Sequence, residues 1–140
     1  MKRLAAACAC LLLLAGCADD GKPKRQREPN RPSMGFIDAP VAESTVGPLF
    51  AVSGWVLDES RVDKVRIYLD DELVATAVVE IMRPDIENAF PGRAEPGKPH
   101  GYSAVVDAGT RAGYCLIRTE AIDGRGGMTQ FASTSVKIAP

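Results

Sequence analysis

Thiols and one imidazole are the most reactive side chains in this sequence of 140 residues, and they are few. The four cysteines are Cys8, Cys10, Cys17 and Cys115, and the single histidine is His100. A structural zinc site takes about four nitrogen or sulfur ligands, and a catalytic one about three protein ligands. Only His100 and Cys115 lie in the part of the chain that can form a folded domain, so we expect no zinc site.

A cysteine–histidine pair could act as a nucleophile only if the thiol were exposed and its pKa lowered. Cys115 has the strand parity of Ile117 and Ala121, so we expect it to face the core as an inert free thiol. His100 lies in a stretch, residues 97–101, with the composition of a turn. The sequence has no Gly-x-Ser-x-Gly elbow and no phosphate-binding glycine loop. We therefore expect a protein that is not an enzyme.

Acidic residues cluster where turns are expected, at Asp58-Glu59, Asp70-Asp71-Glu72 and Asp123. Calcium takes about 6–8 oxygen ligands, and some sandwich domains bind it between loops. These clusters lack the DxDxDG-type spacing, and aspartate also favours turns because its side chain bonds to the nearby backbone. Turn formation is the preferred interpretation, and we expect no metal and no other cofactor in the domain.

The first sixteen residues are typical of a cleaved signal peptide. Lys2 and Arg3 form a short positive region, and residues 4–15 are an uncharged run rich in Leu and Ala. A run of this length is too short to span about 30 Å of hydrocarbon as a helix, but it matches a secretory h-region of about 7–15 residues. The alternative is a buried N-terminal helix, but the segment that follows is polar and gives such a helix no apolar surface to pack against.

The end of this segment, Leu14-Ala15-Gly16-Cys17, resembles the lipobox of bacterial lipoproteins. The resemblance implies cleavage after residue 16, loss of Cys8 and Cys10, and covalent diacylglycerol and N-acyl lipid on Cys17 as the membrane anchor. In lipoproteins of two-membrane bacteria, an Asp directly after the lipidated cysteine often directs retention in the inner membrane. Ala18 stands at that position, so the resemblance favours the outer membrane.

Residues 17–33 are expected to comprise the lipidated Cys17 followed by a disordered, basic, Pro-rich tether. The stretch 18–33 has three prolines and no large apolar residue, so it cannot build a core. It carries a net charge of +2, whereas residues 34–140 carry −5. This charge balance does not indicate a nucleic-acid partner.

Residues 34–140 are expected to form one all-β domain. Apolar residues alternate with polar ones in several stretches, as a half-buried strand requires. The expected inward-facing sets are Val65-Ile67-Leu69, Phe50-Val52-Val56, Tyr102-Ala104-Val106 and Cys115-Ile117-Thr119-Ala121. Turns are expected at residues 70–72 and 123–127. About seven short strands separated by turns predict a β-sandwich.

Residues 36–138 resemble the bacterial immunoglobulin-like domains of surface and exported proteins. The resemblance rests on the order and spacing of Ile37-Asp38-Ala39-Pro40, Val52-Ser53-Gly54-Trp55, Val65-Arg66-Ile67-Tyr68-Leu69-Asp70, Arg83-Pro84-Asp85-Ile86, Phe90-Pro91-Gly92 and Ala121-Ile122-Asp123. It implies an immunoglobulin-like β-sandwich of about seven strands. Such domains often have Tyr or His at the start of the penultimate strand, where it makes a corner hydrogen bond. Cys115 occupies that position here, and Tyr114 is one residue out of register.

The connection between Val79 and Tyr102 is far longer than the usual 4–6 residues, and loops of this length are usually functional or disordered. We expect an ordered crossing loop with one helical turn at residues 85–89. By strand parity Trp55 lies on the outer face of its sheet. We expect residues 80–92 of this loop to fold back over Trp55 and cover it with four apolar side chains, Ile81, Met82, Ile86 and Phe90.

Arg83 and Asp85 are expected to pair within this loop, either as a brace alone or as part of a ligand site. The candidate binding surface consists of Trp55, Arg83, Asp85, Phe90, Arg93, Lys98 and His100, of which Arg93, Lys98 and His100 are expected to be exposed.

Two functions from different classes are open on this evidence. The first is a membrane-anchored envelope lipoprotein that displays a non-catalytic binding, adhesion or structural module to a protein or polysaccharide. The alternative is a periplasmic accessory, inhibitor or chaperone-like subunit that binds one protein partner.

Overall fold

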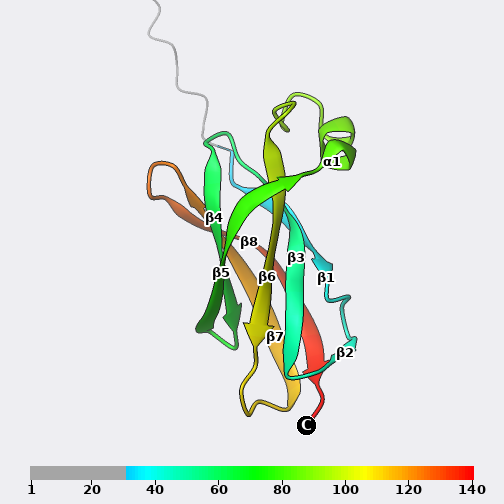
Figure 1. Ribbon diagram of the computed structural model, residues 1–140. Coiled ribbons are helices and arrows are strands. Elements are labelled where there is room, and N and C mark those ends of the chain that lie inside the picture. Colours follow the sequence, from blue (N-terminus) through cyan, green and yellow to red (C-terminus); the bar gives the residue numbers. More distant parts are fainter. Residues whose placement is uncertain (1–30) are drawn as a thin grey trace, which may run out of the picture.

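The computed structural model describes residues 31–140, and the signal peptide, lipobox and most of the tether predicted for residues 1–30 lie outside the described residues. The elements are β1 (Met34–Ala39), β2 (Thr45–Val46), β3 (Leu49–Leu57), β4 (Val62–Leu69), β5 (Glu72–Met82), α1 (Pro84–Ala89), β6 (Pro99–Asp107), β7 (Gly113–Asp123) and β8 (Met128–Ile138) (Figure 1). The predicted all-β sandwich is confirmed, and the two-residue β2 makes eight strands rather than about seven. Among residues 31–140, no helix is long and apolar enough to cross a membrane.

Strand β5 belongs to both layers of the sandwich. The hydrogen-bonded order is β1-β3-β6-β5-β4-β7-β8-β2. The first part of β5, Glu72–Val78, pairs with β4, and its last part, Val79–Met82, pairs with β6. Register irregularities in the last part bend the strand, so that it passes across β6 toward α1 (Figure 1). One layer is therefore β1-β3-β6 with the end of β5, and the other is the start of β5 with β4-β7-β8-β2.

Aspartates build the turns at the ends of the strands. Asp70 and Asp71 join β4 to β5 with φ of +45° and +68°, a left-handed conformation that aspartate tolerates. Asp123 Oδ1 accepts the backbone N–H groups of Arg125 and Gly127, both at 2.8 Å. The predicted role of the acidic clusters in turns is thus confirmed at these two positions. Within residues 31–140, no three His, Cys, Asp or Glu side chains gather as a metal site would need.

The core lies between the two layers and contains the side chains that the alternation predicted. Val65, Ile67 and Leu69 of β4 have no exposed surface. On β7 the buried side chains are Cys115, Ile117, Thr119 and Ala121. The Thr119 hydroxyl is satisfied within the core, since it donates to the Ala132 carbonyl oxygen at 3.2 Å.

A buried tyrosine ties the edge strand β1 to the core. Tyr102 of β6 has no exposed surface, and its hydroxyl donates to the carbonyl oxygen of Phe36 at 3.1 Å. Gly54 makes room for this bond, because a Cβ at residue 54 would lie 1.9 Å from the Phe36 oxygen and 2.7 Å from the Tyr102 hydroxyl. Phe131 of β8 packs edge-on against the Tyr102 ring, with 5.9 Å between centroids. Burial raises the pKa of the Tyr102 phenol, so the hydroxyl stays a donor.

Tyr114, the residue next to the corner position of immunoglobulin-like domains, is 70% exposed. Cys115, which occupies that position, is buried. Among residues 31–140, the tyrosine hydroxyl that bonds to a backbone carbonyl is that of Tyr102, one strand earlier.

The first prediction concerns Gly54. Gly54→Ala forces β1 away from β3 and breaks the Tyr102–Phe36 bond, so we expect the free energy of unfolding to fall by roughly 1–3 kcal/mol or more. Urea denaturation measures this. Gly47→Ala is the matched control, because a Cβ there meets nothing within 4 Å, and it should change stability by no more than about 0.5 kcal/mol. Equal stability of the two variants would contradict the account of Gly54.

Candidate functional site

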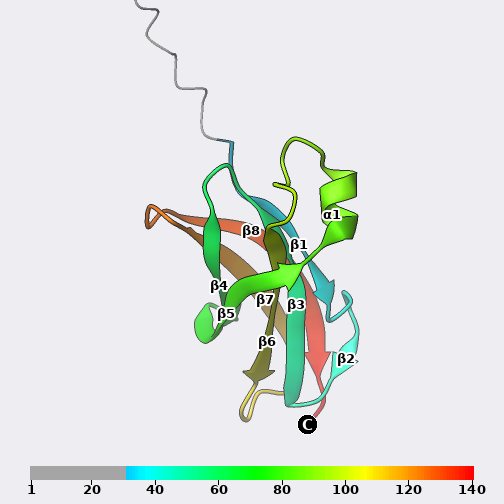
Figure 2. The same ribbon diagram turned by 45° about the horizontal axis from the view of Figure 1, so that its top comes forward.

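The predicted surface residues divide into two neighbouring groups. Trp55, Arg83, Asp85 and Phe90 belong to or contact the crossing segment, residues 83–98, which runs from the end of β5 through α1 to β6 at one end of the β1-β3-β6 layer (Figure 2). Arg93, Lys98 and His100 line a cleft at the end of the sandwich where β1 begins. Cys17, the predicted lipidation residue, lies outside the described residues.

The crossing segment packs against Trp55 through a small apolar cluster of its own. The Trp55 and Phe90 rings are 5.2 Å apart between centroids and tilted by 38°. Leu57, Ile86 and Ala94 are buried beside them. The predicted packing of the loop over Trp55 is therefore confirmed for Ile86 and Phe90.

Ile81 and Met82 lie in a strand and not in the crossing segment, which corrects the predicted extent of the loop. They belong to β5, where Ile81 pairs with Gly101 and Met82 with Pro99, and they are 40% and 51% exposed. The reason is the transfer of β5 from β4 to β6, which keeps the chain in a strand up to Met82. The connection is consequently shorter than predicted. Its predicted helical turn is confirmed as α1, which has Pro84 at its first position, where proline is favoured.

Arg83 holds the crossing segment through two carboxylates. Its Nε and Nη2 donate to the two carboxylate oxygens of Asp85 at 2.9 and 2.7 Å, and its Nη1 donates to Asp38 at 2.7 Å. The bonds to Asp85 keep the pKa of Arg83 above its ordinary value and that of the Asp85 carboxyl below its own. Because all three nitrogens of the guanidinium are engaged, the arrangement favours the bracing role of Arg83 and Asp85.

Asp38 is a member of this brace that sequence reasoning missed. The register of β1 against β3 shifts between Ile37 and Ala39, which puts Asp38 at the irregularity. Gly101 leaves room for the Arg83 side chain over the sheet, since a Cβ at residue 101 would lie 3.0 Å from Arg83 Cγ. Asp38 lies in the Ile37–Pro40 segment of the immunoglobulin-like pattern, but nothing in the spacing indicates a partner 45 residues away.

The second group lines a cleft of about 350 Å³, which we call the end cleft. Its floor is apolar and consists of the buried side chains of Val56, Val62 and Val79. Its rim carries charges of both signs, from Asp58, Glu59, Glu95, Arg61, Arg93 and Lys98. An adjoining hollow of about 290 Å³ shares Asp58, Glu59, Arg93 and Glu95 with it.

His100 lies in the wall of the end cleft and not in an exposed turn, which corrects the prediction. It is only 9% exposed and is the second residue of β6, because the end of β5 pairs with this strand from Pro99 onward. Its Nε2 donates to the Glu95 carbonyl oxygen at 3.0 Å. Nδ1 makes no hydrogen bond within residues 31–140. Because no fully buried side-chain nitrogen or oxygen of these residues lacks a partner, Nδ1 is accessible to solvent, and His100 is one of the residues that line the cleft.

The start of the described chain runs along the rim of the end cleft. Arg93 donates to the Pro32 carbonyl oxygen at 3.4 Å and to the Met34 sulfur at 3.2 Å. The Ser33 hydroxyl donates to Asp58. These contacts fix the direction in which the chain enters β1. Arg93 thus contacts both the cleft and the junction with the predicted tether.

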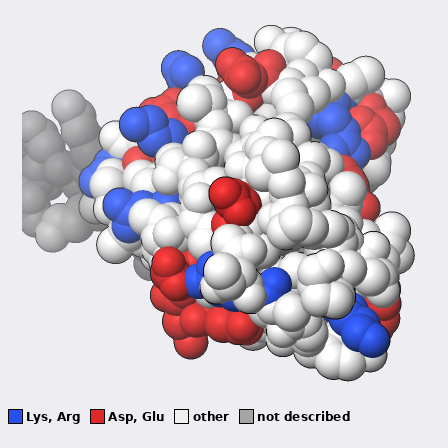
Figure 3. Space-filling model, turned by 60° about the horizontal axis from the view of Figure 1, so that its bottom comes forward, with Lys and Arg blue, Asp and Glu red and all other residues white. Residues whose placement is uncertain are grey.

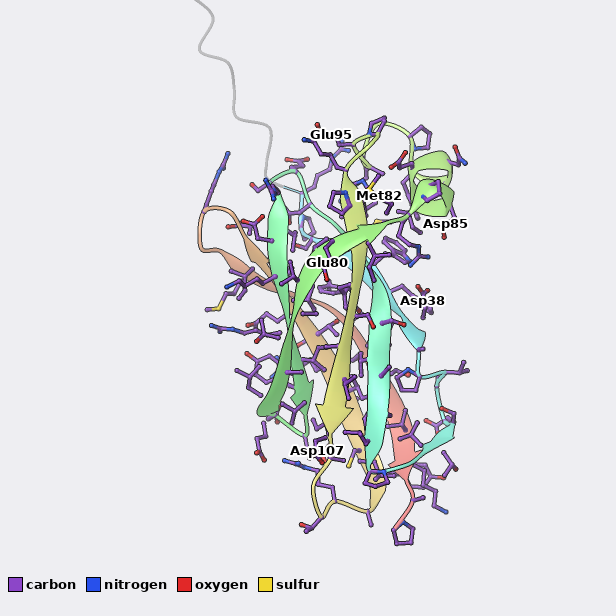
Figure 4. All side chains as sticks on the ribbon, viewed as in Figure 1. Asp38, Glu80, Met82, Asp85, Glu95 and Asp107 are labelled. Atoms are coloured by element: carbon purple, nitrogen blue, oxygen red, sulfur yellow. The ribbon has the colours of Figure 1, made fainter. Side chains whose placement is uncertain are left out.

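Cys115 lies far from His100 and is not positioned as its partner. Strand β6 runs from the end cleft to the opposite end of the domain, where Asp107 lies and β7 begins (Figures 1 and 4). Cys115 is the third residue of β7, it is buried, and its thiol is free. Burial raises the pKa of this thiol, and Asp70 raises it further. The prediction of an inward-facing thiol is confirmed.

Comparison with known proteins identifies the fold but no family. No protein-family model matches the chain, and no curated protein matches it. The fibronectin(III)-like modules of CbhA from Clostridium thermocellum align over 76% of this chain and 96% of theirs, with 20% identity and a TM-score of 0.52. The fold is fibronectin III-like. The predicted immunoglobulin-like sandwich is therefore confirmed as a fold.

Two further solved structures are more distant. CopC from Methylosinus trichosporium OB3b is 15% identical, covers 76% of this chain and 94% of its own, and has a TM-score of 0.40. An LPMO from Kitasatospora papulosa is 15% identical, covers 69% of this chain and 51% of its own, and has a TM-score of 0.44.

The second prediction concerns Trp55, the only tryptophan of the chain. Trp55→Ala removes the surface on which Phe90 and Ile86 pack, so we expect trypsin to cleave after Arg93 about tenfold faster while the circular dichroism of the sandwich is retained. Tyr114→Ala, which truncates an exposed aromatic, is the control. Unchanged cleavage in Trp55→Ala, or acrylamide quenching of the native Trp55 as complete as in urea, would refute the packing.

The third prediction concerns Cys115. Because its pKa is raised in the folded state, the unfolded thiol ionises first as the pH rises. We expect the free energy of unfolding to be unaffected by this group below about pH 8 and to decline as the pH passes the ordinary thiol value of about 8.5. Cys115→Ala should lower stability by about 1 kcal/mol at pH 7 and lack that part of the decline. Rapid labelling of Cys115 by a thiol reagent, in native protein in which Cys8, Cys10 and Cys17 are all replaced by Ser, would contradict its burial.

Proposed function

We propose that the protein is a lipid-anchored lipoprotein of the bacterial cell envelope, with the outer membrane favoured. Lipid on Cys17 anchors the protein in the membrane, and residues 18–33 act as a spacer. Residues 34–140 form a non-catalytic module that binds a protein or polysaccharide partner. The observation that carries the proposal is the order along the chain: an export-type segment ending in Leu14-Ala15-Gly16-Cys17, a polar segment, and a β-sandwich that begins at Met34.

The anchor sets the distance over which the module can act. Several acyl chains, at about 0.8 kcal/mol for each buried methylene, hold a protein on a membrane essentially permanently. A coil of the length of residues 18–33 has a mean reach of roughly 20–25 Å and a limit of roughly 50–60 Å. The partner is therefore expected in the layer next to the membrane.

The surface of the domain supports binding without strong electrostatic steering. In the view of Figure 3, basic and acidic side chains lie in small groups next to one another, separated by uncharged surface. The ion pairs of the domain include Arg118 with Asp71 at 3.3 Å and Arg61 with Asp63 at 2.8 Å. A non-catalytic role is supported by the raised pKa of the buried Cys115 thiol, which opposes a nucleophilic function.

The fourth prediction tests the anchor. Cys17→Ser should move the protein from the detergent phase to the aqueous phase in Triton X-114 partitioning, because the acylated thiol is the proposed membrane attachment. Cys115→Ala is the matched control and should stay in the detergent phase. An unmodified mature Cys17 in wild-type protein, seen by mass spectrometry, would end the proposal.

A further inference from the structure

The end cleft combines an apolar floor with charges of both signs that have no ion-pair partner among residues 31–140. Asp58 and Glu59 are engaged, since Asp58 accepts from Ser33 and Ser60 and Glu59 pairs with Arg31 at 3.7 Å. The Lys98 ammonium and the Glu95 carboxylate, in contrast, make no hydrogen bond or ion pair within the described part of the chain. Glu95 lies at the end of the domain opposite Asp107 (Figure 4).

The groups around the cleft specify the chemistry of a ligand. The Glu95 carboxylate suits an ammonium group, and the Lys98 ammonium suits a carboxylate, because charge-assisted bonds are the stronger ones. His100 bonds to a carbonyl through Nε2, so in the neutral ring Nδ1 is an acceptor for an N–H group. The valine floor suits a small apolar side chain.

The volume limits the size of the ligand. Pockets for small ligands measure about 300–1,000 Å³, and the end cleft lies at the lower end of this range. A few residues of peptide fit, whereas a folded protein surface does not enter.

We propose that the end cleft binds a short peptide that carries a free ammonium group and a free carboxylate. This inference rests on the proposed envelope location, and deepens it by naming the class of partner. Two sources supply such chemistry in an envelope: the peptide part of the wall polymer, and C-terminal ends of other proteins in which a lysine side chain lies near the terminal carboxylate.

The experiment uses methyl NMR of the full mature chain in detergent micelles, with the tripeptide Ala-Ala-Ala as the probe. The methyl groups of Val56, Val62 and Val79 report on the floor directly. We expect their resonances to shift on titration with the free tripeptide. N-acetylation or C-amidation of the probe should weaken binding about tenfold each, as loss of one charge-assisted contact predicts.

Charge-removal variants assign each end of the peptide. Glu95→Gln should lose the preference for a free ammonium and keep the preference for a free carboxylate, and Lys98→Met should do the reverse. Glu80→Gln and Lys137→Met, which remove exposed charges elsewhere, are the matched controls and should keep both preferences.

The possible outcomes separate the two proposals. Absence of valine shifts, equal binding of the blocked and free tripeptides, or unchanged preferences in both variants would overturn the peptide inference while Cys17 partitioning still tests the anchor. Competition with the tripeptide by soluble peptides from digested cell wall, or by synthetic C-terminal peptides of envelope proteins, identifies the source.

Discussion

The absence of a side chain at residue 54 is the constraint on which the rest of the structure depends. Only with that space can the Tyr102 hydroxyl reach the Phe36 carbonyl, and this bond fixes β1 against β3 and the core. The neighbouring residue, Trp55, then presents its ring to the crossing segment. Asp38, two residues after Phe36, is held where Arg83 can reach it. The group of the candidate site around Trp55 and Arg83 therefore depends on one steric fact.

Two kinds of contact hold the crossing segment: the ion pairs of Arg83 and the apolar packing against Trp55. Exposed ion pairs contribute only about 0–1 kcal/mol each, so the Arg83 brace mainly sets direction. The apolar contact of Trp55 and Phe90 adds stabilisation, since burial contributes roughly 25 cal/mol for each Å² of apolar surface. Once the segment is held there, its return to β6 passes over the open end of the sandwich, and the end cleft is the space left beneath it.

The alternation of apolar and polar residues was sufficient to predict side-chain direction wherever one face of a strand is buried and the other is not. The period of two determines which residues of β4 and β7 face inward, because a shift by one residue would expose the whole apolar set. The same parity put Trp55 outside and Cys115 inside. The turn at Asp70 and Asp71 was predictable because aspartate tolerates the left-handed conformation that a tight hairpin needs.

What the sequence by itself determined is the all-β class, the inward rows, the turns and the need to cover Trp55, all of which depend on contacts between near neighbours or on parity. Only the tertiary structure decided that β5 changes layers, that His100 is buried in a strand, that Arg83 bonds to Asp38 and that charges from separate loops surround one cleft. The physical reason is that each of these depends on the spatial order of strands distant in the chain. Alternation specifies which way a side chain points from its own strand, but not which strand lies beside it.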